Sequence, residues 1–222
     1  MDAWFRCGPL TARRGDGRPL FAGVTVRLAE GTFALLAGPS GAGKTTLLRA
    51  IAGLDPAEGA GRFLAGHAYP DHDLPAWRAR VTWIAQDAPM LPGTVRDNLA
   101  FPFSLRAGRG RRLDEEHARG LLAEVGLADL PWERDAREIS GGERHRLALV
   151  RAMLWDPPVL LADEPLTGLD PPRARTCRDL LLSWARRPGH AALVVLHDPE
   201  LGRDADRRLV LAGGRLREEA PR

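Results

Sequence analysis

The chain has 222 residues, of which 44% are hydrophobic and 27% are charged, and it carries two cysteines. This length allows one large domain, or one domain with an inserted lobe, and it can bury a core without disulfides or a structural metal. The composition is that of a soluble globular protein, which excludes intrinsic disorder, collagen and a disulfide-stapled scaffold. Cys7 and Cys177 lie far apart and lack metal-ligand spacing, so they are expected to be reduced thiols.

Charge and hydropathy exclude two further classes of protein. The 32 basic residues exceed the 29 acidic residues by a net charge of only +3, and the two signs are interleaved, so no nucleic-acid partner is expected. No run approaches the roughly 18 apolar residues that a membrane-spanning helix needs, and residues 1–6 show no basic region followed by an apolar run. We therefore expect a cytoplasmic chain without a signal peptide, which reaches a membrane only through a partner.

From the N-terminus onward, short apolar runs alternate with longer helical segments. Strands are expected at residues 24–28, 33–37, 81–84, 159–162 and 192–196, a helix at 45–52, and a last hairpin around 209–214. The stretch 87–155 is mainly helical, at 95–99, 113–125 and 143–154, with an arginine-rich loop at 106–112. Continuous apolar strands separated by helices indicate a mostly parallel sheet covered on both faces, so the expected fold class is α/β with a helical insertion.

A phosphate-binding loop is the strongest single motif. It lies between the strand at 33–37 and the helix at 45–52 and fits the pattern G-x-x-x-x-G-K-[ST] completely. Glycines let main-chain N–H groups close around an anion, Lys44 (the only lysine of the chain) brings its charge to the β- and γ-phosphates, and Thr45 offers its hydroxyl to Mg²⁺. A glycine-rich turn with a chance lysine would not require this context. The expected nucleotide-binding residues are Gly38, Pro39, Ser40, Gly41, Ala42, Gly43, Lys44, Thr45 and Thr46.

Two carboxylates end the apolar strand at 159–162. Asp163 is expected to hold Mg²⁺ through water, and Glu164 to act as the general base that takes a proton from the attacking water. Such a strand end on its own would be ordinary. Together with a complete phosphate loop, it predicts a site of nucleotide hydrolysis.

The segment at 139–146 narrows the class of protein. Ser140 and Glu143 fit a helix-capping box, but a cap does not require Gly141 and Gly142, which weaken the first turn of a helix. Two glycines leave a helix N-terminus open to the close approach of a second anion. The segment resembles the signature motif of ABC-type ATPases, usually written L-S-G-G-Q, with mild departures at its first and last positions.

The resemblance covers residues 4–216 and supplies roles for three more side chains. Gln86 resembles the Q-loop glutamine that senses Mg²⁺ and the attacking water, and it is implied as a metal ligand. Asp170 resembles the D-loop aspartate, and His197 the switch histidine that contacts the γ-phosphate. The implied activity is ATP hydrolysis, with Glu164, His197 and Gln86 as the catalytic group.

The same resemblance implies the domain organisation. Residues 1–222 would form a single ABC ATPase domain with N-terminal antiparallel β-strands. Residues 1–86 and 156–222 would form the P-loop core with its β-subdomain, and residues 87–155 an α-helical subdomain.

One departure from the family concerns adenine. Members of the family carry an aromatic residue upstream of the phosphate loop that stacks on the base, and residues 11–16 contain none. The guanidinium plane of Arg13 or Arg14 is the available substitute. A weak preference for ATP over GTP is therefore expected.

The resemblance also implies a head-to-tail homodimer. The phosphate loop of one subunit and residues Ser140 to Gly142 of the other would enclose each ATP, and closure with hydrolysis would drive an integral membrane permease subunit. The chain would then lie at the inner face of the cell membrane. The apolar stretch 90–103 either contacts that permease or packs inside the helical lobe; Phe101 and Phe103 are the residues in question.

The type of transporter follows from weaker similarities. Residues 85–86 and 94–102 resemble the small ATP-binding subunits of bacterial iron-export ABC systems, while residues 160–165 also resemble lipoprotein-release and cell-division ATPases. A small-molecule kinase would not need the motif at 140–143. A soluble DNA-linked ABC ATPase would need sustained heptads in the insertion, and a non-hydrolysing scaffold would not need Glu164 and His197.

Overall fold

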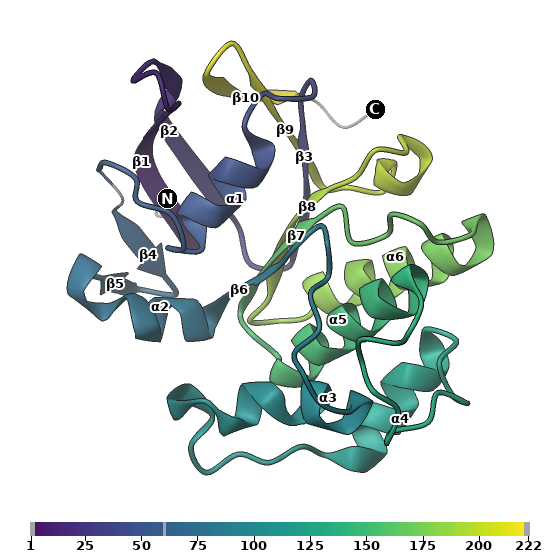
Figure 1. Ribbon diagram of the computed structural model, residues 1–222. Coiled ribbons are helices and arrows are strands. Elements are labelled where there is room, and N and C mark those ends of the chain that lie inside the picture. Colours follow the sequence, from purple (N-terminus) through teal and green to yellow (C-terminus); the bar gives the residue numbers. More distant parts are fainter. Residues whose placement is uncertain (1–2, 60, 220–222) are drawn as a thin grey trace.

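The computed structural model describes residues 3–59 and 61–219, so the extreme ends of the predicted domain, at 1–2 and 220–222, lie outside the described residues. Two β-sheets and a group of helices make up the molecule (Figure 1). The first sheet is antiparallel with the order β2-β1-β4-β5. Its strands are β1 (Phe5–Arg13), β2 (Pro19–Leu28), β4 (Arg62–Leu64) and β5 (His67–Tyr69).

The second sheet is mostly parallel and has the order β10-β9-β3-β8-β7-β6. Its strands are β3 (Thr32–Ala37), β6 (Val81–Ile84), β7 (Val159–Asp163), β8 (Ala191–Val195), β9 (Arg207–Ala212) and β10 (Arg215–Glu219). Only the β9–β10 hairpin at the edge is antiparallel.

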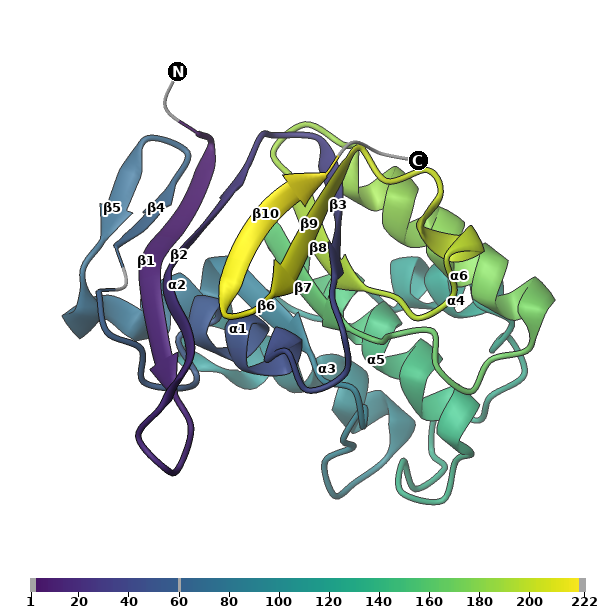
Figure 2. The same cartoon turned by 90° about the horizontal axis from the view of Figure 1, so that it is seen from above.

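The helices divide between the two faces of this parallel sheet. Helix α1 lies between the two sheets, whereas α3 to α6 lie on the other side, as the view from above shows (Figure 2). The α-helices are α1 (Lys44–Ile51), α2 (Leu74–Arg80), α3 (Val95–Ser104), α4 (Glu115–Glu124), α5 (Gly141–Trp155) and α6 (Pro171–Ala185). Short 3-10 turns occur at η1 (Asp71–Asp73), η2 (Arg106–Gly108) and η3 (Glu200–Gly202).

Strand alternation explains the two hydrophobic cores. In β3, Phe33 and Leu35 face α3 to α6, while Ala34 and Leu36 face α1 and the antiparallel sheet. Successive side chains of a strand point to opposite faces, and both faces here are covered, so the strand reads as a continuous apolar run. The parallel sheet is therefore the layer on which both halves of the molecule pack.

The predicted fold class, a mostly parallel α/β core with N-terminal antiparallel strands and inserted helices, is confirmed. Two helices, α2 and α6, were not among the expected elements, and β2 begins five residues before the expected strand at 24–28. The arginine-rich segment at 106–112 begins with the turn η2 rather than being loop throughout. Within the part of the chain that is described, no helix has both the length and the apolar character to cross a membrane.

Candidate nucleotide site

The predicted site residues follow four neighbouring parallel strands. The phosphate loop follows β3, His197 follows β8, and Gln86 follows β6, while Asp163 ends β7 and Glu164 comes directly after it. These strands are adjacent in the order β3-β8-β7-β6. The carboxyl ends of parallel strands meet at one edge of a sheet, where open α/β sheets bind ligands. Four segments that are distant in the sequence thus form one row.

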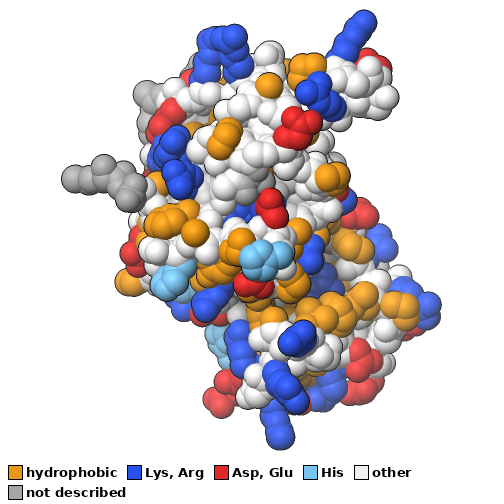
Figure 3. Space-filling view, turned by 90° about the vertical axis from the view of Figure 1, so that its left-hand side faces the viewer, with side chains coloured by type: hydrophobic (Ala, Val, Ile, Leu, Met, Phe, Trp, Pro, Cys, Tyr) orange, Lys and Arg blue, Asp and Glu red, His pale blue; other side chains and the backbone are white. Residues whose placement is uncertain are grey.

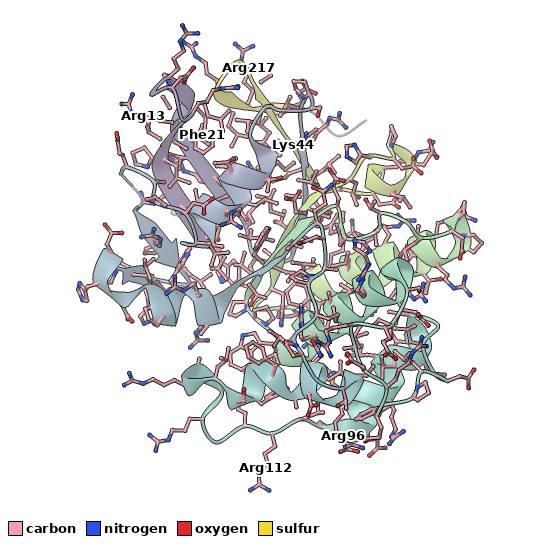
Figure 4. All side chains as sticks on the ribbon, viewed as in Figure 1. Arg13, Phe21, Lys44, Arg96, Arg112 and Arg217 are labelled. Atoms are coloured by element: carbon pink, nitrogen blue, oxygen red, sulfur yellow. The ribbon has the colours of Figure 1, made fainter. Side chains whose placement is uncertain are left out.

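The phosphate loop owes its shape to glycines with specific neighbours. Gly38 has a φ of +146°, and a Cβ there would lie 2.2 Å from the carbonyl oxygen of Leu211, so the loop passes directly over β9. Gly43 caps α1 in the left-handed region, at φ +98°, without a side-chain cap for the helix N–H groups. Lys44 donates from Nζ to the carbonyl oxygens of Gly38 and Pro39 at 2.9 and 3.1 Å, and Figure 4 places it at the start of α1. The loop and its ammonium group form a cradle that suits a polyphosphate.

Asp163 provides a test of whether the site suits a cation. Its side chain is 1% exposed, and its Oδ2 atom has no hydrogen-bond partner in the described part of the chain. Burial raises the pKa of this carboxyl, while a hydrogen bond with Thr45 and the charge of Lys44 act in the opposite direction. A buried carboxylate oxygen without a partner, beside the Thr45 hydroxyl, is a hard-oxygen donor set of the kind that Mg²⁺ prefers. The residues therefore fit the ion that the sequence predicts.

Glu164 joins the other two predicted catalytic residues. Its Oε1 lies 2.6 Å from His197 Nε2, and its Oε2 accepts a hydrogen bond from Gln86 Nε2 at 3.0 Å. The Glu164 side chain is 12% exposed, against 68% for His197. Its backbone φ of +52° is unusual for a residue other than glycine and reflects strain of the kind found at functional sites. Three side chains separated by up to 111 positions in sequence thus meet at one carboxylate.

The signature segment forms the first turn of α5. Ser140 and Glu143 form a complete capping box, with Ser140 N donating to Glu143 Oε2 at 2.7 Å and Glu143 N donating to Ser140 Oγ at 3.3 Å. The main-chain hydrogen bond from Ser140 holds the pKa of Glu143 below its usual range. The capping box is therefore observed, whereas the binding of a second nucleotide by this glycine-rich turn remains a prediction. Among the described residues, no hydrogen bond or ion pair links residues 140–143 to the phosphate loop of the same chain.

Asp170 lies beside the signature and caps the next helix. Its carboxylate accepts a hydrogen bond from Arg173 N at 3.0 Å at the start of α6, and this bond lowers its pKa. A Cβ on Gly142 would lie 3.5 Å from the carbonyl oxygen of Gly168, so the segment leading to Asp170 packs against the signature turn. The capping role was not predicted, although an aspartate followed by two prolines is a recognisable helix start.

Arg13, the predicted adenine contact, is engaged elsewhere on its own sheet. Its guanidinium pairs with Glu58 at 3.4 Å and donates to the carbonyl oxygen of Gly17 at 3.2 Å. Figure 4 shows it near the tip of the β1–β2 hairpin. Arg14, the other candidate, forms no side-chain ion pair within the described residues. The stacking role remains a prediction.

One residue of the site region was missed by the sequence analysis. His145, on α5, reaches the main chain of Gln86, with Nε2 lying 2.8 Å from the carbonyl oxygen. Its position in the helix four residues after Gly141 gives no sign of this contact, because it depends on how the loop after β6 folds over α5.

An apolar groove of about 600 Å³ opens between α2, β6, α3, η2 and α5. All four exposed large hydrophobic residues of the described chain line it: Leu54, Leu91, Phe101 and Leu105, which are 36–47% exposed. Figure 3 shows hydrophobic side chains gathered across the lower half of that face with basic side chains beside them. Phe103 is partly buried and packs against the helical core, with its ring 6.0 Å from that of Trp155. Internal packing therefore accounts for Phe103, whereas a permease contact at Phe101 remains a prediction.

The sequence of this chain is similar to those of known proteins. A family model described as ABC transporter matches residues 21–167. The aliphatic sulfonates import ATP-binding protein SsuB of Cupriavidus necator is 40% identical over 92% of this chain, which spans only 65% of that relative's length. The lipoprotein-releasing system ATP-binding protein LolD of Anaeromyxobacter dehalogenans is 36% identical, and the alignment covers 91% of this chain and 87% of LolD.

A solved structure gives the same result for the fold. It is the dimeric structure of a post-hydrolysis state of an ATP-binding cassette bound to ADP and Pi, with a TM-score of 0.85 and 27% identity. The match covers 98% of this chain and 99% of the other. Because the family model covers more than half of the chain and a relative above 30% identity is covered over most of its length, this chain belongs to the ABC transporter family, as an ATP-binding domain.

Proposed function

We propose that this chain binds and hydrolyses ATP as one half of a head-to-tail dimer and powers a membrane permease. The observation that carries the proposal is the contact of Gln86 and His197 with the two oxygens of Glu164, next to the cradle of Lys44 and the buried Asp163. A carboxylate that contacts an amide and an imidazole at the end of the parallel sheet suits the activation of a water molecule beside a γ-phosphate.

The residues of the site would then divide the reaction among them. Lys44 and the loop N–H groups hold the β- and γ-phosphates, and Glu164 accepts a proton at a carboxylate oxygen from the attacking water. Gln86 and His197 orient that carboxylate, and His197, which is largely exposed, is free to reach the γ-phosphate. Mg²⁺ bound by Thr45, Asp163 and Gln86 would neutralise charge that builds on the phosphates during transfer.

The dimer supplies the part that one chain lacks. Among the described residues, no hydrogen bond or ion pair joins the signature turn at Ser140 to Gly142 to the chain's own phosphate loop, so the N–H groups of its two glycines would be available to a nucleotide held by a second copy. A related cassette is dimeric in its ADP- and Pi-bound structure. The proposed homodimer therefore contains two equivalent sites, each completed by both copies.

Substitution of Glu164 by Gln tests this function. Glu164→Gln keeps the size of the side chain and one acceptor oxygen but removes the proton acceptor, so ATP should stay bound and hold two copies together. Size-exclusion chromatography with light scattering should show a dimer with ATP and Mg²⁺ and a monomer without them. Adding Lys44→Ala to the same chain should abolish the dimer; a Glu164→Gln chain that stays monomeric with ATP and Mg²⁺ would contradict the model.

The apolar groove is the proposed site for the permease. It takes a segment with apolar side chains on one face, and Arg78, Arg106 and Arg151 on its walls favour acidic groups on that segment. Residues 87–155 would act as the helical subdomain that carries much of this groove, with residues 1–86 and 156–222 as the core. Binding there would hold the chain peripherally at the inner face of the cell membrane.

For the transported substrate we propose metal export, with iron as the first candidate, on the similarity at residues 85–86 and 94–102 to small iron-export subunits. Lipoprotein release is the second candidate, supported by a relative whose length this chain nearly spans. The complex of this chain with its permease, reconstituted in liposomes, separates the two candidates. Stimulation of ATPase activity by Fe²⁺ supports the first candidate, and stimulation by an acylated lipoprotein supports the second.

A further inference from the structure

A single side chain connects the signature turn with the catalytic carboxylate. His145 lies one helical turn after Gly141, with Nδ1 2.9 Å from the Gly141 carbonyl oxygen and Nε2 2.8 Å from that of Gln86. Gln86 in turn donates from its side chain to Glu164 at 3.0 Å. A continuous series of contacts therefore runs from Gly141 through His145 and Gln86 to Glu164.

This series has a particular meaning in the proposed dimer, on which the inference rests. Gly141 would lie against the nucleotide held by the partner copy, whereas Gln86 and Glu164 serve the nucleotide held by the same chain. We propose that His145 is a positioning residue that couples the two nucleotide sites of the dimer. Closure of the partner's site on the signature turn would reach Gln86 through the imidazole ring.

The ring suits this task because it is short and rigid. Only two side-chain torsions separate its nitrogens from the helix, so a displacement of the first turn of α5 passes directly to the Gln86 main chain. The loop after β6 is also held at a second point on α5, so its overall fold does not rest on His145 alone. Further along the same helix, Arg151 donates to the carbonyl oxygen of Pro89 and to Asn98, each at 3.2 Å. Loss of His145 should therefore leave the fold intact and remove only the link at Gln86.

Mixed dimers test the coupling, with Lys44→Ala used to silence one site of each dimer. Where His145→Ala and Lys44→Ala are on the same subunit, the working site uses the altered subunit's signature turn. Where they are on different subunits, the working site uses the altered subunit's own Gln86. Dimers with Lys44→Ala alone set the reference rate.

The proposal expects kcat to fall about fivefold or more in both arrangements, with KM for ATP within about twofold. His145 holds the signature turn that one site uses and the Gln86 main chain that the other site uses, and neither contact needs nucleotide in the silenced site. His72→Ala is the matched control, since His72 is exposed and lies outside the site, and it should change neither arrangement. His145→Gln, whose amide can donate to the Gln86 carbonyl oxygen, should recover part of the rate. His145→Phe keeps the ring without its nitrogens and should behave as His145→Ala, which guards against loss through packing.

Unchanged rates in both arrangements would overturn the proposal, and so would a loss confined to one, since a residue serving only one site does not couple two. Different results would show that the proposed function, ATP hydrolysis by a head-to-tail dimer, is itself wrong. Reference dimers that do not hydrolyse ATP, or a Glu164→Gln chain with intact His145 that does not dimerise with ATP, would refute the proposed function rather than the role of His145.

Discussion

The only lysine of the chain lies where the geometry selects for it. Lys44 Nζ fits inside the curve of the phosphate loop, within hydrogen-bond distance of two of its carbonyl oxygens. Every other lysine or arginine position of the chain is arginine. A guanidinium is a broad, planar group with fixed donor directions, whereas an ammonium is compact and directs its donors freely.

Lys44→Arg should therefore fail although it keeps the charge. We expect both Lys44→Arg and Lys44→Ala to weaken binding of a fluorescent ATP analogue at least about tenfold. The arginine side chain is too large for the cradle, and the alanine side chain lacks the charge that binds the phosphates. Arg49→Lys, on the same helix but paired with Asp55, should bind nucleotide as the unaltered chain does. Full binding by Lys44→Arg would show that charge alone is required.

The two thiols offer a prediction that concerns folding rather than catalysis. Burial raises the pKa of Cys7 to about 12 and that of Cys177 to about 11, against 9.0 for an exposed thiol. The thiolate is the reactive form, so both should resist alkylation at pH 8 in the native protein and react fully in denaturant. Raising the pH to 9.0 should speed the labelling of denatured protein far more than that of native protein. Rapid native labelling monitored by mass spectrometry would contradict the burial.

The sequence could predict that site residues lie together where strand order sets their neighbours, although their roles remain predictions. Asp163, Glu164, Gln86 and His197 lie at or just after the ends of strands, and parallel strands bring their ends together wherever the sheet forms. The partners of Arg13 and His145 were not predictable in this way. They depend on how a hairpin meets a loop and how a loop crosses a helix, and neither has a sequence period.

At the scale of single elements, α5 shows how one turn serves two purposes. Its capping box closes the N-terminus through side chains, while glycines at the first two helical positions keep it narrow. The Glu143 carboxylate has a lowered pKa because it accepts the Ser140 N–H. A carboxylate with a depressed pKa stabilises the fold above its ordinary value of 4.5, and that stabilisation is lost as the pH falls through the lowered value.

Two substitutions at Glu143 separate the cap from its charge. Glu143→Ala should cost about 1 kcal/mol and lower Tm by about 2–4 °C at pH 7, because the Ser140 N–H loses its partner. Glu143→Gln keeps a side-chain acceptor and should lower Tm by less. Thermal unfolding followed by circular dichroism at pH 7 and pH 4 provides the measurement. The advantage of the native chain over Glu143→Gln should shrink at the lower pH, and an advantage that grows there would refute the assigned cause.

The elements differ in how far their sequences disclosed them. Strands β3, β7 and β8 are buried on both faces, so they appear as unbroken apolar runs. Helix α6 carried a usable signal, since its buried residues 174, 177, 181 and 184 have helical spacing. Helix α2 has seven residues and buries only Trp77, and β4 and β5 have three residues each, so none of these is long enough to show a period.

At the scale of the whole molecule, the candidate nucleotide site and the apolar groove are built from two of the same elements, the loop after β6 and helix α5. The loop after β6 carries Gln86, in the candidate nucleotide site, and continues through Pro89 and Leu91, which line the groove. Helix α5 begins with the signature turn and ends with Ala152 and Trp155 at the groove wall. A segment bound in the groove therefore rests on the same two elements that carry Gln86 and the signature.

The position of the two phenylalanines predicts opposite results for the same kind of change. Phe101→Asp, on the exposed groove surface, should leave Tm and ATP binding unaltered and reduce co-purification with the permease at least about fivefold. Phe103→Ala, where the ring is partly buried against the helical core, should instead lower Tm, because it removes the packing beside Trp155.

Ala123→Asp on the exposed face of α4 is the matched control for an added charge outside the groove. It should retain the membrane partner in full, since α4 contributes nothing to the groove lining. If Phe101→Asp retains the partner as well, the permease binds elsewhere and the groove has another occupant. If all three variants lose it together, the loss reflects a general change of surface or fold, and the four exposed apolar residues are not the contact that we propose.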